Sequence, residues 1–448
     1  MVELKINQTE KQETLRNIVR EIVNSKQKTW VAGQDWVQYS GSFIDEKEYI
    51  AIIDTLLDGW FALGENGIRF ESKFPSQLGK EHGCLTNSGS SANLLMVSAL
   101  TSRKLHALPK GSKVITPVAG FPTTINPIIQ NGLTPVFIDI ELETLNLDIN
   151  QLEEAAKKGA SALIFAHVLG NPPNMEAVMD IVKRYNLILL EDCCDALGST
   201  YKGSRLGTFG EMSSCSFYPA HHITMGEGGF VATKTKEQEM VVKSLREWGR
   251  GCYCSGKKAS CLRNGMCKKR FSNWLPSLPN EVFDHKYVYE EIGYNLKPLD
   301  MQASMGLVQL DKLPSIIEKR KHNFNRLYDV FSKYGDKFVL PKATDGADPS
   351  WFAFPLTVKD NADFKRTEFT MYMEDNKVQT RNYFGGNILL QPAYSHLCEG
   401  DPVKDYPIAT KATTNTFFLG TSPIITDEQI DYIDSVVTKF FADRGSLH

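Results

Sequence analysis

The sequence predicts an α/β fold with a large, mixed but mostly parallel sheet and a smaller α/β domain at the C-terminal end. Three observations carry this prediction. Apolar runs of strand length alternate with helical segments through the first half of the chain. A second alternation of strands and helices, with prolines, begins near Asp336. The chain has 448 residues and is 42% hydrophobic, which is enough for two or three domains with substantial cores.

The first half of the chain supplies the elements of the large sheet. A charged arm with helical periodicity covers residues 10–28, and residues 45–63 carry apolar side chains at helical spacing. The next segments read as four strands, with helical stretches such as 175–185 between them, at residues 113–117, 135–139, 162–168 and 187–191. Strands that alternate with helices indicate a parallel sheet covered on both faces, and such sheets bind ligands at the carboxyl ends of their strands.

The second half begins with a predicted helix at 236–248 and an irregular, basic, cysteine-bearing segment that runs to Gly293. A loop of that length is usually functional or disordered, and its cysteines favour a function. Further helices are expected at 299–333 and 427–444. We therefore predict a helical arm at 1–40, a large domain at 41–310 that includes the cysteine loop 252–285, and a small domain at 311–448.

Composition excludes several classes of function. Lys and Arg total 50 and Asp and Glu total 53, so the net charge of -3 argues against a nucleic-acid binder. The N-terminus lacks a signal-peptide pattern, and no apolar run approaches the roughly 18 residues of a membrane helix. We expect a cytoplasmic protein without membrane or nucleic-acid partners, in which the nine cysteines are thiols or metal ligands rather than disulfides.

Residues 216–230 form a strand, a polar turn, and a glycine-rich turn into another apolar strand. An α/β enzyme keeps its reactive groups at such a junction. The turn carries two adjacent histidines, His221 and His222, and a glutamate, Glu227. A packed loop with a solvated histidine is the alternative.

Three further positions could serve a ligand. Small residues at 88–91 precede an apolar helix, where free N–H groups bind an anion or where Ser88 is simply an N-cap. Asp192 ends an apolar strand, where its carboxylate could pair with a cationic ring nitrogen or cap a turn. Phe121 is either a platform for ring stacking or a core residue.

Together with residues 293–295 and 300–303, these motifs resemble the DegT-type sugar aminotransferases, which have the type I pyridoxal-phosphate (PLP)-dependent aminotransferase fold. The resemblance covers residues 40–440. It implies that Asp192 pairs with the pyridine nitrogen, that Phe121 stacks on the ring, and that Asn295 reaches the cofactor phosphate of a neighbouring subunit in a homodimer. It also implies a phosphate site made of Ser88, Gly89, Ser90, Ser91 and Ser216.

The sequence departs from this family at one decisive position. His221 stands where an aminotransferase has the lysine that binds the cofactor covalently. An imidazole has no primary amine for that bond, but it can act as a general base near neutral pH. Transamination is therefore disfavoured and proton abstraction is retained, while a decayed, inactive aminotransferase is the alternative.

The cysteines resemble those of the family branch that removes the C3 hydroxyl of CDP-4-keto-6-deoxy-glucose. There, four cysteines bind a [2Fe-2S] cluster. The resemblance implies Cys194, Cys252, Cys254 and Cys267 as ligands, with Cys261 as the rival for the fourth. A structural zinc at the same thiols is the alternative, because C-x-C spacing does not exclude zinc.

The sequence thus predicts a 3-dehydrase that depends on pyridoxamine phosphate (PMP) and a [2Fe-2S] cluster, with His221 as the base. Its expected substrate is a nucleotide-linked 4-keto-6-deoxy sugar, CDP-linked by resemblance, and its product a 3,6-dideoxy or related sugar for surface polysaccharide, such as lipopolysaccharide O antigen, or a glycosylated metabolite. Electrons would come from a separate NAD(P)H-dependent iron–sulfur flavin reductase. The alternatives are a cluster-free 3-dehydratase, an ordinary sugar aminotransferase, and a non-catalytic protein of the same fold with a structural zinc.

Overall fold

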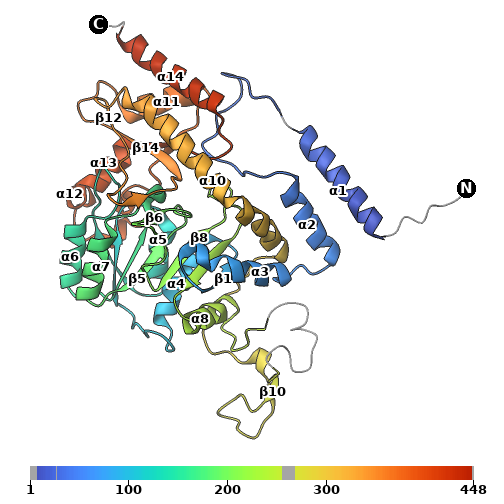
Figure 1. Cartoon of the computed structure of the whole chain (residues 1–448). Coiled ribbons are helices and arrows are strands. Elements are labelled where there is room, and N and C mark those ends of the chain that lie inside the picture. The colour runs from blue at the N-terminus through green and yellow to red at the C-terminus, as the bar shows by residue number, and fades with distance from the viewer. Residues whose placement is uncertain (1–7, 27, 255–267, 446–448) are drawn as a thin grey trace, which may run out of the picture.

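The computed structural model describes residues 8–26, 28–254 and 268–445. Its centre is a seven-stranded sheet (Figure 1). The strand order is β1 (His82–Thr86), β9 (Gly229–Thr233), β8 (Met212–Ser216), β5 (Ile188–Asp192), β4 (Ala162–Ala166), β2 (Lys113–Pro117) and β3 (Thr134–Ile138). Only β9 runs against the others, because it pairs antiparallel with both β1 and β8. The predicted mixed, mostly parallel sheet is therefore confirmed.

Helices cover both faces of this sheet. Alternate residues of β4 belong to two different cores: Leu163 and Phe165 pack on one face, and Ala162 and Ile164 on the other. The first core includes α3 (Glu65–Lys73), α6 (Ile149–Lys157) and α7 (Met175–Arg184), and the second includes α4 (Gly89–Thr101) and α8 (Lys236–Arg246). Burial on both faces explains why these strands read as continuous apolar runs.

Polar side chains fix where the surrounding helices begin. Ser88 caps α4 and Asn174 caps α7, each by accepting a backbone N–H from the first turn. Thr235 and Gln238 form a capping box at the start of α8. Such caps satisfy donors that a helix leaves free, and each typically contributes about 1 kcal/mol.

A second, antiparallel sheet lies in the C-terminal part of the chain. Its strand order is β12 (Phe338–Val339), β14 (Ala353–Val358), β16 (Thr416–Gly420) and β15 (Arg381–Asn382). An aromatic core joins it to α11 (Arg366–Asp375) and α14 (Asp427–Gly445). These elements make the smaller α/β unit that the sequence predicts.

One helix connects the two sheets. Helix α10 (Asp300–Ser332) has 33 residues and crosses the molecule diagonally (Figure 1). Its Ala303, Leu313 and Ile316 pack in the core of the large sheet, whereas Phe324 and Leu327 pack in the core of the small sheet. The domain boundary predicted at residues 310 and 311 lies inside this helix.

The N-terminal arm begins with α1 (Gln8–Ser25), which has no buried residue and lies beside α2 (Glu46–Asp58) (Figure 1). An ion pair of 2.9 Å between Arg16 and Asp54 joins the two helices. The chain then crosses to the small sheet, where the Val37 N–H donates to the Lys377 carbonyl at 2.8 Å. This crossing brings Tyr39 to the space between the two sheets.

The segment after α8 projects from the body of the molecule (Figure 1). In its described part, β10 (Phe271–Ser272) pairs with β11 (Phe283–Asp284). Residues 255–267 of the predicted cysteine loop lie outside the described residues. Among the helices that the structure describes, none has the length and apolar character needed to cross a bilayer.

Candidate active site

A cavity of about 520 Å³ lies at the carboxyl ends of the large sheet's strands. Pro117 ends β2, Ala166 ends β4, Asp192 ends β5 and Ser216 ends β8, and all four line it. The opposite wall comes from the small domain and from the N-terminal arm, with Phe352, Arg381, Phe418 and Tyr39. The cavity thus occupies the place where an α/β sheet normally binds its ligand.

The start of α4 forms an anion cradle at this cavity. Gly89 and Ser90 line the cavity, whereas Ser88 and Ser91 form the cap itself, with the Ser91 N–H donating to Ser88 Oγ at 3.1 Å. A Cβ at Gly89 would lie only 2.5 Å from the Cβ of Ser216, so a side chain there would fill the cradle. Ser88 is therefore an N-cap, and the neighbouring N–H groups of the first turn remain available to an anion.

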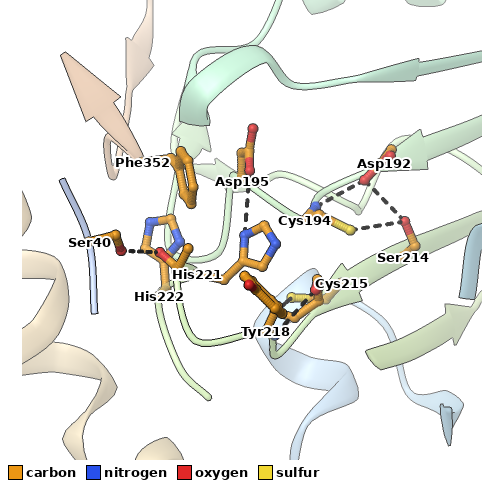
Figure 2. A network of polar contacts seen from close by, with 12 residues as sticks. Ser40, Asp192, Cys194, Asp195, Ser214, Cys215, Tyr218, His221, His222 and Phe352 are labelled. Carbon is orange, nitrogen blue, oxygen red and sulfur yellow. Dashed lines mark hydrogen bonds and ion pairs between the residues drawn. The ribbon is translucent and has the colours of Figure 1, made fainter. Parts of the chain in front are cut away.

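Asp192 is buried and lines the cavity, and Figure 2 shows its carboxylate bonded to Cys194 and Ser214. It accepts four hydrogen bonds: from Asn93 Nδ2 at 2.7 Å, Thr124 Oγ1 at 2.8 Å, the Cys194 N–H at 3.1 Å and Ser214 Oγ at 3.3 Å. All four donors are neutral, so they orient the carboxylate without cancelling its charge. This environment fits a cationic N–H on a ligand ring.

Phe121 is not a core residue. It is 51% exposed, lines the cavity and contacts Phe384 edge to face at a centroid distance of 6.0 Å. The ring is therefore available to stack on a flat ligand.

His221 lies in the turn after β8, and its ring faces the cavity (Figure 2). Its Nδ1 is 3.4 Å from Asp195 Oδ1, and its ring centroid is 5.2 Å from that of Phe352. Sequence reasoning missed Asp195 and Phe352. Asp195 carried a usable signal, because it is a carboxylate three residues beyond Asp192 at the same strand end, whereas Phe352 comes from the small domain.

Burial disfavours a charge on His221 and on Asp195 alike. It lowers the pKa of His221 to about 4, and the cationic Arg320 acts in the same direction. It also raises the pKa of Asp195 to about 8, with repulsion from Asp192 as the second cause. Although 3.4 Å would permit an ion pair, the His221 Nδ1 makes no hydrogen bond of good geometry. At neutral pH, His221 is thus a neutral imidazole, the form that accepts a proton.

Arg320 fixes the backbone of the turn. This fully buried side chain of α10 donates to the carbonyls of Ala220 and His221, both at 3.1 Å, and to that of Phe352 at 3.0 Å. Ser40 Oγ donates to the same Ala220 carbonyl at 2.9 Å. Two distant parts of the chain therefore hold the backbone of the His221 turn in place.

His222, to which the sequence assigns no role, is structural. It is buried, and its Nε2 donates to the Ser350 carbonyl at 2.7 Å. This bond ties the turn to the small domain, and His222 does not line the cavity. The two adjacent histidines therefore have different functions.

The predicted cysteine ligands are only partly described. Cys194 lines the cavity, with its Sγ 4.0 Å from Ser214 Oγ, and Cys252 and Cys254 are half-buried free thiols. Among the described residues, the thiols of Cys194, Cys252 and Cys254 do not lie close enough together to share a metal ion. The group whose ligand atoms all lie within 4.8 Å of one another is instead His167, Glu191 and Cys193. Cys261 and Cys267 lie outside the described residues.

Asn295 is exposed and lies outside the cavity of its own chain. Its Oδ1 accepts a hydrogen bond of 2.7 Å from Lys297 Nζ. The position leaves Asn295 free to meet another molecule.

Comparison with known proteins agrees with this geometry. Residues 42–438 match the model of the DegT/DnrJ/EryC1/StrS aminotransferase family. The chain belongs to this family. The family's fold also appears in the solved structure of Escherichia coli GDP-4-keto-6-deoxy-D-mannose-3-dehydratase with bound hydrated PLP, at a TM-score of 0.77 and 29% identity over 90% of this chain and 99% of that one. This confirms the predicted type I PLP-dependent aminotransferase fold.

Two relatives within the family are more similar in sequence. Lipopolysaccharide biosynthesis protein RfbH of Salmonella typhimurium is 44% identical over 92% of this chain and 94% of its own length. The dTDP-4-dehydro-2,6-dideoxy-D-glucose 3-dehydratase of Saccharopolyspora spinosa is 42% identical over 92% of this chain and 88% of its own length. The similarity therefore extends across both domains.

The low pKa of His221 predicts a pH-dependent stability for this family member. Between pH 6.5 and about 4 the unfolded chain protonates this imidazole while the folded chain does not, so folding weakens as the pH falls. We expect His221→Gln to reduce the slope of unfolding free energy against pH by up to about 1.4 kcal/mol per pH unit in this window. Chemical denaturation of wild type and His221→Gln at several pH values measures the difference between the two slopes. His222 and Asp195 are present in both proteins, so their titrations cancel in this difference. Equal slopes would contradict the assigned pKa.

Proposed function

We propose that this chain is a nucleotide-sugar 3-dehydrase that removes the C3 hydroxyl of a nucleotide-linked 4-keto-6-deoxy hexose with pyridoxamine phosphate as cofactor. The observation that carries the proposal is that His221 lines the cavity as a neutral imidazole, at the position where the resemblance places the family's cofactor-binding lysine. The relatives named as 3-dehydratases support this activity class.

The residues at the cavity fit the cofactor. Gly89 and Ser90, at the N-terminus of α4, and Ser216, at the end of β8, would hold its phosphate, and Asp192 would pair with its ring nitrogen. Phe121 would lie against its ring. When bound, the cofactor supplies an electron-withdrawing ring that stabilises negative charge on the adjacent carbon. The exposed Asn295 would complete the phosphate site of a second copy, so we propose a homodimer.

His221 acts as the base in this proposal. Nδ1 is buried beside Asp195, so Nε2 is the ring nitrogen that a ligand can reach, and the proposal assigns the proton transfer to Nε2. Asp195 and the Phe352 ring lie beside the imidazole, Arg320 donates to the His221 carbonyl, and Ser40 donates to the Ala220 carbonyl. The protonated Nε2 then returns a proton to the departing C3 hydroxyl, which leaves as water.

Net replacement of the hydroxyl by hydrogen consumes two electrons and two protons and releases one water. We propose that a separate NAD(P)H-dependent iron–sulfur flavin reductase supplies the electrons. The proposal assigns a [2Fe-2S] cluster to Cys194, Cys252, Cys254 and Cys267, with CDP as the nucleotide of the substrate. It rests on the cysteine pattern, since four thiolates are the usual ligand set for such a cluster. A 3,6-dideoxyhexose for lipopolysaccharide is the expected product.

Anaerobic purification and a substrate panel test this function. We expect a coloured protein with about two iron and two sulfide per chain and turnover of a 4-keto sugar only with the reductase and NAD(P)H. CDP-, dTDP- and GDP-linked substrates distinguish the nucleotide. Cys252→Ser should lose the colour, whereas Cys398→Ser, which alters another half-buried free thiol, should keep it.

Each other outcome selects a different function. Turnover with glutamate alone and without iron would identify a cluster-free 3-dehydratase. An amino-sugar product would identify an aminotransferase. A colourless zinc protein without turnover would rule out the enzyme.

A further inference from the structure

The cavity contains two basic side chains among its described lining residues, Arg381 and His221. His221 is neutral at pH 7 because of its burial. Arg381 is therefore the permanent positive charge of the described lining, which also contains the carboxyl groups of Asp192 and Asp195. A guanidinium at a ligand cavity can pair with an anionic group of the ligand.

Arg381 lies on β15, the edge strand of the small sheet, and is exposed. Its guanidinium carbon is 4.2 Å from the centroid of the Tyr39 ring, and its Nη1 donates to the Thr380 carbonyl at 2.7 Å. The residues that the structure describes give it no carboxylate partner. Stacking of a guanidinium on an aromatic ring fixes its plane and leaves donors on its edge free for an oxyanion.

The neighbouring residue adds a second donor. Asn382 also lines the cavity, and its Oδ1 accepts a hydrogen bond of 2.6 Å from Arg366 Nη1. Because the oxygen is engaged by Arg366, the Nδ2 amide is the group that Asn382 offers to a ligand. The two residues together present only donors to an anion.

This donor pair and the anion cradle belong to opposite walls of the cavity. The cradle comes from α4 and β8 of the large domain, whereas Arg381 and Asn382 come from β15 of the small domain. The cradle matches the single phosphate of the cofactor. A second anion site on the other wall indicates a ligand that carries phosphate of its own.

We propose that Arg381, stacked on Tyr39 and assisted by Asn382, binds the diphosphate of the nucleotide-linked sugar. The assignment rests on the proposed function and specifies which part of the substrate the small domain recognises. A planar guanidinium can form two parallel, charge-assisted hydrogen bonds to phosphate oxygens, and these are stronger than its hydrogen bonds to an uncharged sugar or nucleobase. Arg381 is therefore a binding residue that selects a diphosphate-linked substrate.

The test uses enzyme loaded with pyridoxamine phosphate, so that the cradle on α4 is filled. Calorimetric titration with CDP, dTDP and GDP, and with the nucleoside of whichever diphosphate binds, compares wild type with Arg381→Gln and Arg381→Lys. We expect Arg381→Gln to weaken binding of the diphosphate by about 10- to 100-fold, with no change for the nucleoside. Arg381→Lys should restore part of the affinity. In turnover assays the Arg381→Gln variant should raise KM and leave kcat nearly unchanged.

Lys377→Gln is the matched control, because Lys377 also stacks on an aromatic ring of the N-terminal segment, Trp36, at 5.0 Å, but lies outside the cavity. It should bind the diphosphate as wild type does. Equal diphosphate affinity in wild type and Arg381→Gln, an equal loss for nucleoside and diphosphate, or no diphosphate binding by wild type would each overturn the assignment. These binding results do not depend on turnover, so they leave the role of His221 to be judged separately.

Discussion

Replacement of His221 with Asn is expected to lower turnover by about 10²- to 10⁴-fold, which is the usual contribution of a general base. The amide is polar like the imidazole, although smaller, and it cannot accept a proton at neutral pH. Cofactor affinity should stay close to that of wild type, because Asp192 and the cradle at Gly89 and Ser216 are unchanged. Steady-state turnover and fluorescence titration with pyridoxamine phosphate measure the two quantities.

Two companion variants sharpen this test. His222→Asn is the matched control: it removes the bond to the Ser350 carbonyl, so it should lower the melting temperature while turnover per folded molecule persists. His221→Lys should restore a primary amine at this position, so that borohydride reduction fixes pyridoxal phosphate to the chain as a mass increase. Wild-type turnover in His221→Asn would refute the base assignment.

Replacement of Asp192 with Asn is expected to weaken cofactor binding and turnover together. The carboxylate is buried among neutral donors, so its charge is available to a protonated ring nitrogen. Loss of one partner of a buried, hydrogen-bonded charge pair costs about 2–5 kcal/mol. Titration of the variant with pyridoxamine phosphate should therefore show a dissociation constant at least tenfold higher.

Asp300 provides a matched control for this substitution. Both aspartates are 4% exposed, and each accepts four hydrogen bonds, those of Asp300 from Gly64, Asn66 and Gly67 at the start of α3. Asp300→Asn should lower the melting temperature without changing cofactor affinity. A similar loss of affinity in both variants would mean that Asp192 acts through stability and not through the ring nitrogen.

Local patterns were sufficient to predict most elements of the fold. The predicted strand at residues 113–117 matches β2, and the predicted helix at 299–333 differs from α10 by one residue at each end. These segments are long or buried on both faces, so their periodicity is strong. The domain boundary was less predictable, because the repeat of apolar residues in α10 does not reveal that its two halves enter different cores.

Some residues of the candidate site could be predicted from local sequence, and others could not. Asp192, Ser216 and His221 lie next to strand ends, where sequence order and position in space coincide, and all three line the cavity. Arg320 and Phe352 reach the same turn from distant parts of the chain. No local pattern distinguishes a buried arginine that binds carbonyl groups from one that binds water. The separate roles of His221 and His222 also required knowledge of what each ring contacts.

Helix α10 has a consequence for how the two halves of the molecule can move. It runs through both halves of the molecule, with Pro314 inside it, and Arg320 on it donates to the carbonyls of the His221 turn and to the Phe352 carbonyl. Movement of one half against the other would break these bonds in the fully buried interior. We therefore expect the His221 turn and the Phe352 segment of the small domain to move together.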